Sequence, residues 1–169
     1  NKNGRKIFGE IGPAFMRWHG MRTAQICNIF KHDVFREDKN RIKCVLGVQT
    51  AWHGLEKDAL ECAGWKHKSN LPCYKQGFDH IAITSYFSGK LGGPNDKKEK
   101  KYIEKLIDWA SSPEGVDLAF EQLQTGNPLR SAGKELKDYN GIYEKLKSHM
   151  KYWTSTAKLY GLTLIAYEG

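Results

Sequence analysis

The stretch "LTLIAYEG" at residues 162–169 decides the fold class. Its alternate positions carry Leu, Leu and Ala on one side and Thr, Ile and Tyr on the other, so both faces of a strand here would be largely apolar. Two apolar faces are typical of a strand in a parallel sheet that is covered on both sides. The run ends in the carboxylate of Glu168. We therefore predict a buried parallel strand over 162–167 with a charged group at its carboxyl end.

Two further apolar runs predict strands of the same sheet, "IKCVLGVQ" at 42–49 and "FDHIAITSYF" at 78–87. Segments with the apolar spacing of helices separate and precede the strands. These segments span 9–35, 55–65, 97–112, 113–126 and 133–161, with Gly126 and Gly161 as expected C-terminal stops. Strands that alternate with helices indicate βαβ units and a parallel sheet. The predicted class is α/β.

Composition limits the kinds of protein that this chain can be. Its 169 residues fit one domain, and a hydrophobic fraction of 40% argues against disorder. No stretch reaches the roughly 20 apolar residues of a membrane span. The net charge of +8 would suit an acidic partner, but the basic residues are scattered along the chain, which argues against nucleic-acid binding.

The four cysteines form no CxxC pair and no metal-binding spacing with histidine, so we expect no zinc site. Cys27 and Cys44 lie in apolar segments, where buried free thiols are common. Cys62 and Cys73 flank a loop and could pair in an oxidising compartment. The sequence leaves their state open.

The reactive groups of parallel α/β folds gather at the carboxyl ends of the strands. The residues at the three predicted ends are Gln49, Thr50 and Trp52; Ser85, Tyr86 and Phe87; and Tyr167 and Glu168. A carboxylate among aromatic and uncharged hydrogen-bonding groups is typical of a sugar site, because sugar faces stack on aromatic rings and sugar hydroxyls need polar partners. The sequence thus predicts a carbohydrate site.

Each of these residues also has an ordinary structural interpretation. Trp52 and Tyr86 would be core or rim aromatics, Gln49 would cap its strand, and Glu168 would be solvated. Asp79 and His80 begin their strand, which places them at the opposite edge, where residues contribute to stability. The acidic residues of the second helical segment, Glu56, Asp58 and Glu61, read as a solvated helix face.

Four pieces of the sequence together carry a resemblance to a known family. They are "MRWHGMRTAQICNIF", "VLGVQTAW", "FDHIAITSYFSGKLGG" and "LTLIAYEG". The chain resembles a family of bacterial proteins labelled glycosyl hydrolase or cellulose-binding, whose fold is similar to the (β/α)8 barrel of the clan A retaining glycosidases. The resemblance covers nearly the whole chain and is most specific at "ITSYF" and "IAYEG".

The resemblance implies a function and a set of roles. The strands would be about strands five to seven of a partial TIM (β/α)8 barrel, so that residues 1–169 are one fragment of a catalytic domain. Glu168 would match the nucleophile at the end of strand seven, and Tyr86 would orient it. Trp52, Gln49, Tyr167 and Phe87 would bind the substrate, a β-linked polysaccharide or oligosaccharide.

The acid/base glutamate of such enzymes follows an asparagine at the end of strand four, and no Asn-Glu pair occurs in this sequence. Barrels of this kind take about 250 residues or more. We therefore expect a fragment that is inactive alone, with a carbohydrate partner, no metal or organic cofactor, and a secreted or periplasmic location. The alternatives are a non-catalytic carbohydrate-binding barrel and, more distantly, a basic polyanion-binding module.

Overall fold

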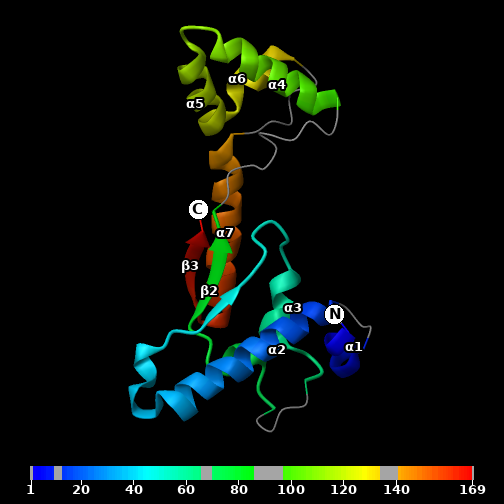
Figure 1. Cartoon of the computed structure of the whole chain (residues 1–169), viewed down its shortest axis with the longest axis vertical. Helices are drawn as coiled ribbons and strands as arrows, with labels where there is room; N and C mark the ends of the chain where they lie inside the picture. The colour runs from blue at the N-terminus through cyan, green and yellow to red at the C-terminus, as the bar shows by residue number, and fades with distance from the viewer. Residues whose placement is uncertain (1, 10–12, 66–69, 86–96, 134–140, 169) are drawn as a thin grey trace. The chain divides into compact units, whose positions relative to one another are not determined.

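The computed structural model describes residues 2–9, 13–65, 70–85, 97–133 and 141–168 (Figure 1). The chain divides into two compact units, one of Asn1–Thr84 with Tyr152–Glu168 and the other of Ser85–Lys151. The first unit holds the sheet and the second is helical.

The sheet of the first unit has three strands, β1 (Val45–Gly47), β2 (His80–Thr84) and β3 (Thr163–Glu168), in the order β1-β2-β3. Both neighbouring pairs are parallel. β1 and β2 lie within the predicted runs, β3 is shifted by one residue from the predicted 162–167, and the pairing is parallel, as expected for βαβ units. All three carboxyl ends therefore meet at one edge of the sheet. That these strands are part of a (β/α)8 barrel stays a prediction.

One face of the sheet packs against α7 (Ile142–Tyr160), whose last residues belong to the first unit (Figure 1). The side chains of Leu46 and Ile81 are fully buried in this core, together with Trp153 of α7. Burying an aliphatic or aromatic side chain of this size contributes about 2 kcal/mol. This apolar face is the main source of the sheet's stability.

The other face of the sheet is less covered. Val45 on β1 is 40% exposed, and Ile165 on β3 is half-buried. Space is open within 4 Å of where Gly47 would carry a Cβ. Only Ala82, in the central strand, is buried on this side. The prediction of a buried strand at 162–167 is wrong for β3: Leu164 and Ile165 are half-buried, and Ala166 and Tyr167 are exposed.

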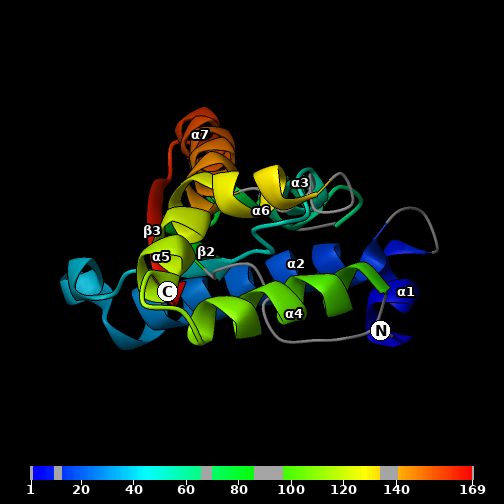
Figure 2. The same cartoon turned by 90° about the horizontal axis from the view of Figure 1, so that it is seen from above.

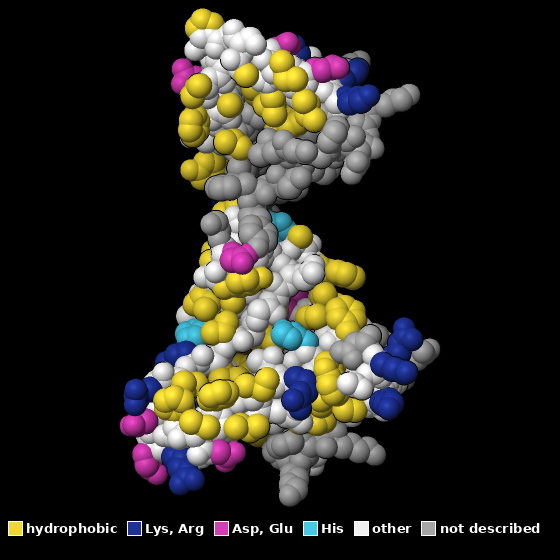
Figure 3. Space-filling view, viewed as in Figure 1, with side chains coloured by type: hydrophobic (Ala, Val, Ile, Leu, Met, Phe, Trp, Pro, Cys, Tyr) yellow, Lys and Arg dark blue, Asp and Glu magenta, His cyan; other side chains and the backbone are white. Residues whose placement is uncertain are grey.

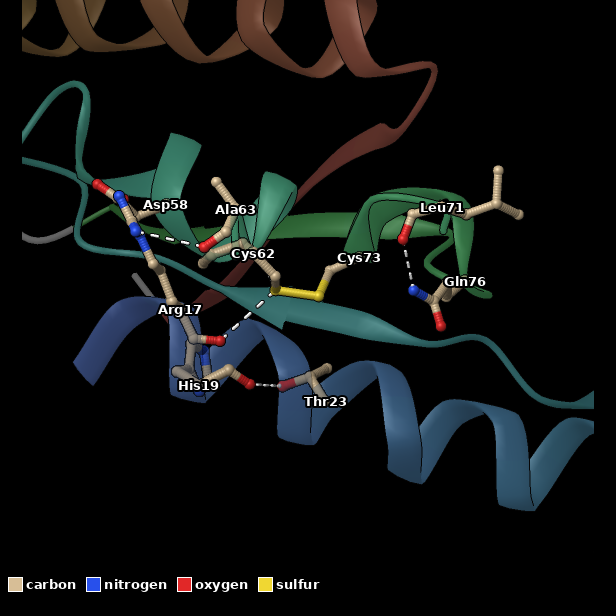
Figure 4. Close-up of a disulfide and its surroundings, with 10 residues drawn as sticks. Arg17, His19, Thr23, Asp58, Cys62, Ala63, Leu71, Cys73 and Gln76 are labelled. Carbon is tan, nitrogen blue, oxygen red and sulfur yellow. Dashed lines mark hydrogen bonds and ion pairs between the residues drawn. A yellow bond between two sulfur atoms is a disulfide. The ribbon is translucent and has the colours of Figure 1, made fainter. Parts of the chain in front are cut away.

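Helices α2 (Ala14–Asn28) and α3 (Leu55–Glu61) cross at very short range. A Cβ added to Gly20 would lie 1.8 Å from the carbonyl oxygen of Ala59, so the crossing requires glycine. Beside it, Arg17 Nε donates to Asp58 Oδ1 at 2.7 Å and its Nη1 to the Ala63 carbonyl at 3.3 Å (Figure 4). The two helices are fixed both by close packing and by an ion pair.

The predicted helix over 9–35 is more varied in the structure. It begins at Ala14 and passes after Asn28 into a π-helical segment, η1 (Ile29–Val34). The charged residues that follow form a 3-10 helix, η2 (Arg36–Arg41). A first helix, α1 (Lys2–Phe8), was not predicted and packs on α2.

Exposed apolar side chains run along α2 and η1, where Figure 3 shows a row of hydrophobic atoms. They include Phe15, Ile26, Ile29, Phe30 and Val34. An exposed apolar row of this kind is more than a scattering of single residues and often marks a contact surface.

The second unit contains α4 (Lys97–Ala110), α5 (Gly115–Thr125) and α6 (Asn127–Ala132), of which α6 was not predicted (Figure 2). Its small core forms around Tyr102 and Leu129. Gly126 ends α5 with a left-handed φ of 75°, and Gly161 follows α7 with a φ of 67°, so both predicted glycine stops are confirmed.

The cysteines form two disulfides. Cys27 of α2 is bonded to Cys44, directly before β1, so its interpretation as a buried free thiol is wrong. Cys62 at the end of α3 is bonded to Cys73 at the start of η3 (Cys73–Lys75), as Figure 4 shows. The first bond ties the long helix to the sheet, and the second closes the loop between α3 and β2.

Candidate carbohydrate site at the carboxyl edge of the sheet

A pair of threonine hydroxyls joins the ends of β1 and β2. Thr50 Oγ1 lies 3.0 Å from Thr84 Oγ1, accepts a hydrogen bond from the Thr84 amide at 2.8 Å, and lies 3.0 Å from the Thr84 carbonyl. The Val48 amide donates to the Ala82 carbonyl, which is the last backbone hydrogen bond described between these two segments. Beyond it, the Thr50 hydroxyl takes the place of a backbone group and extends the pairing of β1 with β2. The result is a fixed edge that carries two hydroxyls.

An irregularity in the pairing of β2 and β3 brings Glu168 to this edge. Ile83 is paired with Ala166, but Thr84 is paired with Glu168, so Tyr167 is an extra residue on β3. A bulge of this type redirects the side chains that follow it, and such bulges are frequent next to active sites. Without the extra residue, Tyr167 would be the partner of Thr84. The bulge therefore sets Glu168, and not Tyr167, beside Thr84.

The predicted aromatic and amide groups at this edge are accessible. Trp52 is 58% exposed and Tyr167 is 55% exposed, and Gln49 is also exposed. Glu168 is exposed too, so its carboxylate is open to solvent. Tyr86 and Phe87 lie outside the described residues, and the expected contact between Tyr86 and Glu168 stays a prediction.

The loop of residues 49–54, which carries Gln49 and Trp52, is attached to neighbouring elements along its length. Trp153 Nε1 of α7 donates to the Thr50 carbonyl at 3.0 Å, and the Trp52 amide donates to the Gln49 carbonyl at 3.2 Å. At the far end, the Gly54 amide donates both to Glu56 Oε2 at 2.8 Å and to the Tyr152 hydroxyl at 2.9 Å. The loop is fixed at both of its ends.

Glu56 was predicted to lie on a solvated helix face, and this is wrong. It is only 4% exposed, and its Oε1 accepts a short hydrogen bond of 2.5 Å from the Tyr152 hydroxyl. The other two acidic residues of α3 also have partners, because Asp58 is paired with Arg17 and Glu61 accepts from Tyr160 at 3.0 Å. Their partners are distant in the sequence.

Tyr152 is enclosed on a second side by an aromatic contact. The ring of His53 stacks on the ring of Tyr152, with centroids 3.8 Å apart and planes within 7° of parallel. Burial raises the pKa of Tyr152, and its hydrogen bond to Glu56 and the negative charge there raise it further. Tyr152 is therefore held as a neutral donor to the Glu56 carboxylate.

The opposite edge of the sheet is structural, as the sequence predicted. Asp79 Oδ2 accepts from Lys31 Nζ at 2.6 Å and from the Cys44 amide at 2.7 Å. Burial by itself would raise the pKa of Asp79, but these two hydrogen bonds and the charge of Lys31 outweigh burial and lower it. The ion pair joins η1 to the starts of β1 and β2.

Among the described residues, no group of three or more His, Cys, Asp or Glu side chains is arranged to hold a metal ion. In the same part of the chain, no helix combines the length and the apolar character that crossing a bilayer requires.

Comparison with protein-family models, with curated proteins and with solved structures finds no match to this chain. The geometry of the carboxyl edge is therefore what bears on function. It brings Thr50, Thr84 and Glu168 to neighbouring strand ends and leaves two aromatic rings exposed close to them in the sequence.

Proposed function

We propose that this chain carries one side of the active site of a retaining glycoside hydrolase, in which Glu168 is the nucleophile and the substrate is a β-linked polysaccharide or oligosaccharide. The observation that carries the proposal is the bulge at Tyr167, which pairs Glu168 with Thr84 at the carboxyl edge of a parallel sheet. Bulges at such positions direct functional side chains.

The chemistry assigns each group a separate task. The Glu168 carboxylate attacks the anomeric carbon, the bond from that carbon to the leaving oxygen breaks, and a glycosyl-enzyme ester forms. A second carboxyl group, about 5–5.5 Å from the first, protonates the leaving oxygen and then activates the water that hydrolyses the ester. In this proposal the second group stands on a strand that would precede β1, because the sequence has no Asn-Glu pair.

The exposed groups of the edge suit the binding of a sugar. The ring of Trp52 offers an apolar surface for one face of a pyranose, and the Gln49 amide offers hydrogen bonds to its hydroxyl groups. The two disulfides support a location in an oxidising compartment, as expected for an enzyme that acts on external polysaccharide.

The exposure of the aromatic rings also favours a second candidate, a carbohydrate-binding protein without catalysis. Trp52 and Tyr167 are both more than half exposed, which suits stacking against a glycan chain. In that case Glu168 would accept a hydrogen bond from a sugar hydroxyl and would form no covalent bond. The two candidates therefore differ in the chemistry of a single carboxylate.

The test is mechanism-based labelling with a fluorinated β-glycoside that carries an activated leaving group. Such a leaving group departs without a general acid, so labelling depends on the nucleophile and on sugar binding. Mass spectrometry of the digested protein should find the sugar on the peptide that contains Glu168, and Glu168→Gln should abolish the label. Glycan binding without any label would favour the binding protein.

A further inference from the structure

We propose that the three residues Tyr152, Glu56 and Gly54 form a latch that holds the loop of residues 49–54 in one conformation, so that Trp52 is presented to ligands as a preformed platform. Tyr152 and Glu56 are then positioning residues for the binding site. That the ligand is the apolar face of a sugar ring rests on the proposed function, whereas the latch itself rests on the contacts alone.

The burial of Glu56 is the first step of the argument. A carboxylate that is 4% exposed is costly unless hydrogen bonds replace its hydration. Here Oε1 accepts from the Tyr152 hydroxyl and Oε2 accepts from the Gly54 amide. Each partner comes from a different segment, α7 and the end of the loop. Satisfying the carboxylate therefore requires that the loop end stay next to α7.

Gly54 makes the geometry of the latch possible. Its φ of 94° lies in the left-handed region, which glycine adopts without strain, and the chain turns there from the loop into α3. The turn points its amide at both acceptors, Glu56 Oε2 and the Tyr152 oxygen. A residue with a side chain would lose this turn or pay for it in strain.

The remainder of the loop is fixed by contacts that do not involve the latch. Thr50 is joined to Thr84 by its hydroxyl and to Trp153 by its carbonyl. Trp52 thus lies between two anchored points, and yet its own side chain is 58% exposed. An exposed aromatic ring on a loop with fixed ends loses little conformational entropy when a ligand stacks on it, which is how preorganisation raises affinity.

The chain provides a matched control for the latch. Tyr160 lies on the same helix as Tyr152 and also donates to a carboxylate of α3, Glu61 Oε1, at 3.0 Å. The hydrogen bond described for Glu61 leads to α7, whereas the Glu56 carboxylate also accepts from the loop amide of Gly54. Tyr152→Phe and Tyr160→Phe therefore each remove one tyrosine-to-glutamate hydrogen bond, and only the first affects the latch.

The experiment is amide hydrogen exchange, residue by residue, in the wild type and in both variants. In Tyr152→Phe the amides of Trp52 and Gly54 should exchange about tenfold faster, since a lost hydrogen bond to a charged group allows a change of about 1.4 kcal/mol or more in local opening. The amide of Ile81 in the core should be unchanged. In Tyr160→Phe the loop amides should exchange as in the wild type.

Equal exchange at Trp52 and Gly54 in the two variants would overturn the latch, and so would an equal acceleration over the whole chain. Glu56→Gln is the second variant, because an NH2 group, which only donates, replaces one of the two carboxylate oxygens that accept from Tyr152 and Gly54. It should accelerate the same amides. Binding of a soluble β-glucan oligosaccharide is measured in parallel and should weaken about tenfold in Tyr152→Phe. If the wild type binds none while the exchange result holds, the proposed function fails and the latch stands.

Discussion

Replacement of Gly20 by alanine tests how closely α2 and α3 must approach. The new Cβ would lie 1.8 Å from the Ala59 carbonyl oxygen, 2.6 Å from its carbonyl carbon and 2.8 Å from its Cα, whereas ordinary contact begins at 3.4 Å. The obstacle is helix backbone, which cannot rotate away as a side chain would. The two helices would have to separate by about 1.6 Å at their crossing, the difference between those distances.

The free-energy cost follows from two opposed effects. Overpacking of this kind destabilises by about 3 kcal/mol, and alanine regains about 1 kcal/mol over glycine within a helix. The expected net loss is about 2 kcal/mol of the unfolding free energy. That is a large share of a total stability of about 5–15 kcal/mol for a domain.

Urea unfolding followed by far-ultraviolet circular dichroism measures the effect. Gly47→Ala is the control, because space is open around its Cβ position, and it should change the unfolding free energy by less than about 0.5 kcal/mol. If Gly20→Ala is as stable as Gly47→Ala, the close crossing of α2 and α3 is wrong.

Three further predictions follow from the contacts. The lowered pKa of Asp79 means that its carboxylate stabilises the fold above its unfolded pKa of about 3.8 and that this contribution is lost as the pH falls towards the folded value. Asp79→Asn should therefore lower the free energy of unfolding by about 1.5–3 kcal/mol at neutral pH. The difference in unfolding free energy between this variant and the wild type, measured by urea titration, should become smaller below about pH 4. A difference that does not vary with pH would contradict the ion pair. Burial, aided by hydrogen bonds to carboxylates, raises the pKa of Tyr152 and of Tyr160, so each Tyr→Phe variant should remove one ionisation above the ordinary value of 10 from an absorbance titration, and a variant with an unchanged titration would contradict the hydrogen bond. Reduction of the two disulfides should lower the unfolding free energy by about 3 kcal/mol for each bond, measured as the shift of the urea midpoint with and without dithiothreitol, and an unchanged midpoint would show that the thiols are not paired.

The strands could be predicted because their signal is local. The apolar runs around β1, β2 and β3 are bounded by polar residues, and strands that alternate with helices predict parallel pairing. The two glycine stops, Gly126 and Gly161, were predictable for the same reason, since a left-handed residue after a helix favours glycine wherever the helix lies.

The features that the sequence did not reveal depend on residues far apart in the chain. Glu56 looks solvated next to its neighbours, and it is buried because Tyr152, 96 residues later, donates to it. Cys27 looks like a core thiol until the packing of α2 on the sheet brings Cys44 to it, with 5.8 Å between their Cα atoms. The stacking of His53 on Tyr152 also joins residues that are far apart in the sequence. The sign of the latch that the local sequence gives is the glycine at position 54.

The bulge at Tyr167 is a further example, and it matters most for function. The alternation in "LTLIAYEG" assigns Glu168 to the face of Leu164, but the pairing of β3 with β2 inserts one extra residue and pairs Glu168 with Thr84. Register is a property of two strands and cannot be read from one of them. The sequence predicted that Glu168 lies at the sheet edge, and the structure adds the neighbour beside it.

The measurement that tests the central claim most directly is the identification of the carboxylate that a fluorinated, activated β-glycoside labels in this protein. The account predicts a sugar ester on Glu168, located by tandem mass spectrometry of the C-terminal peptide, and no ester in Glu168→Gln. An ester on another carboxylate, or unlabelled Glu168 in a protein that binds the same glycoside, would contradict the assignment of Glu168 as the nucleophile.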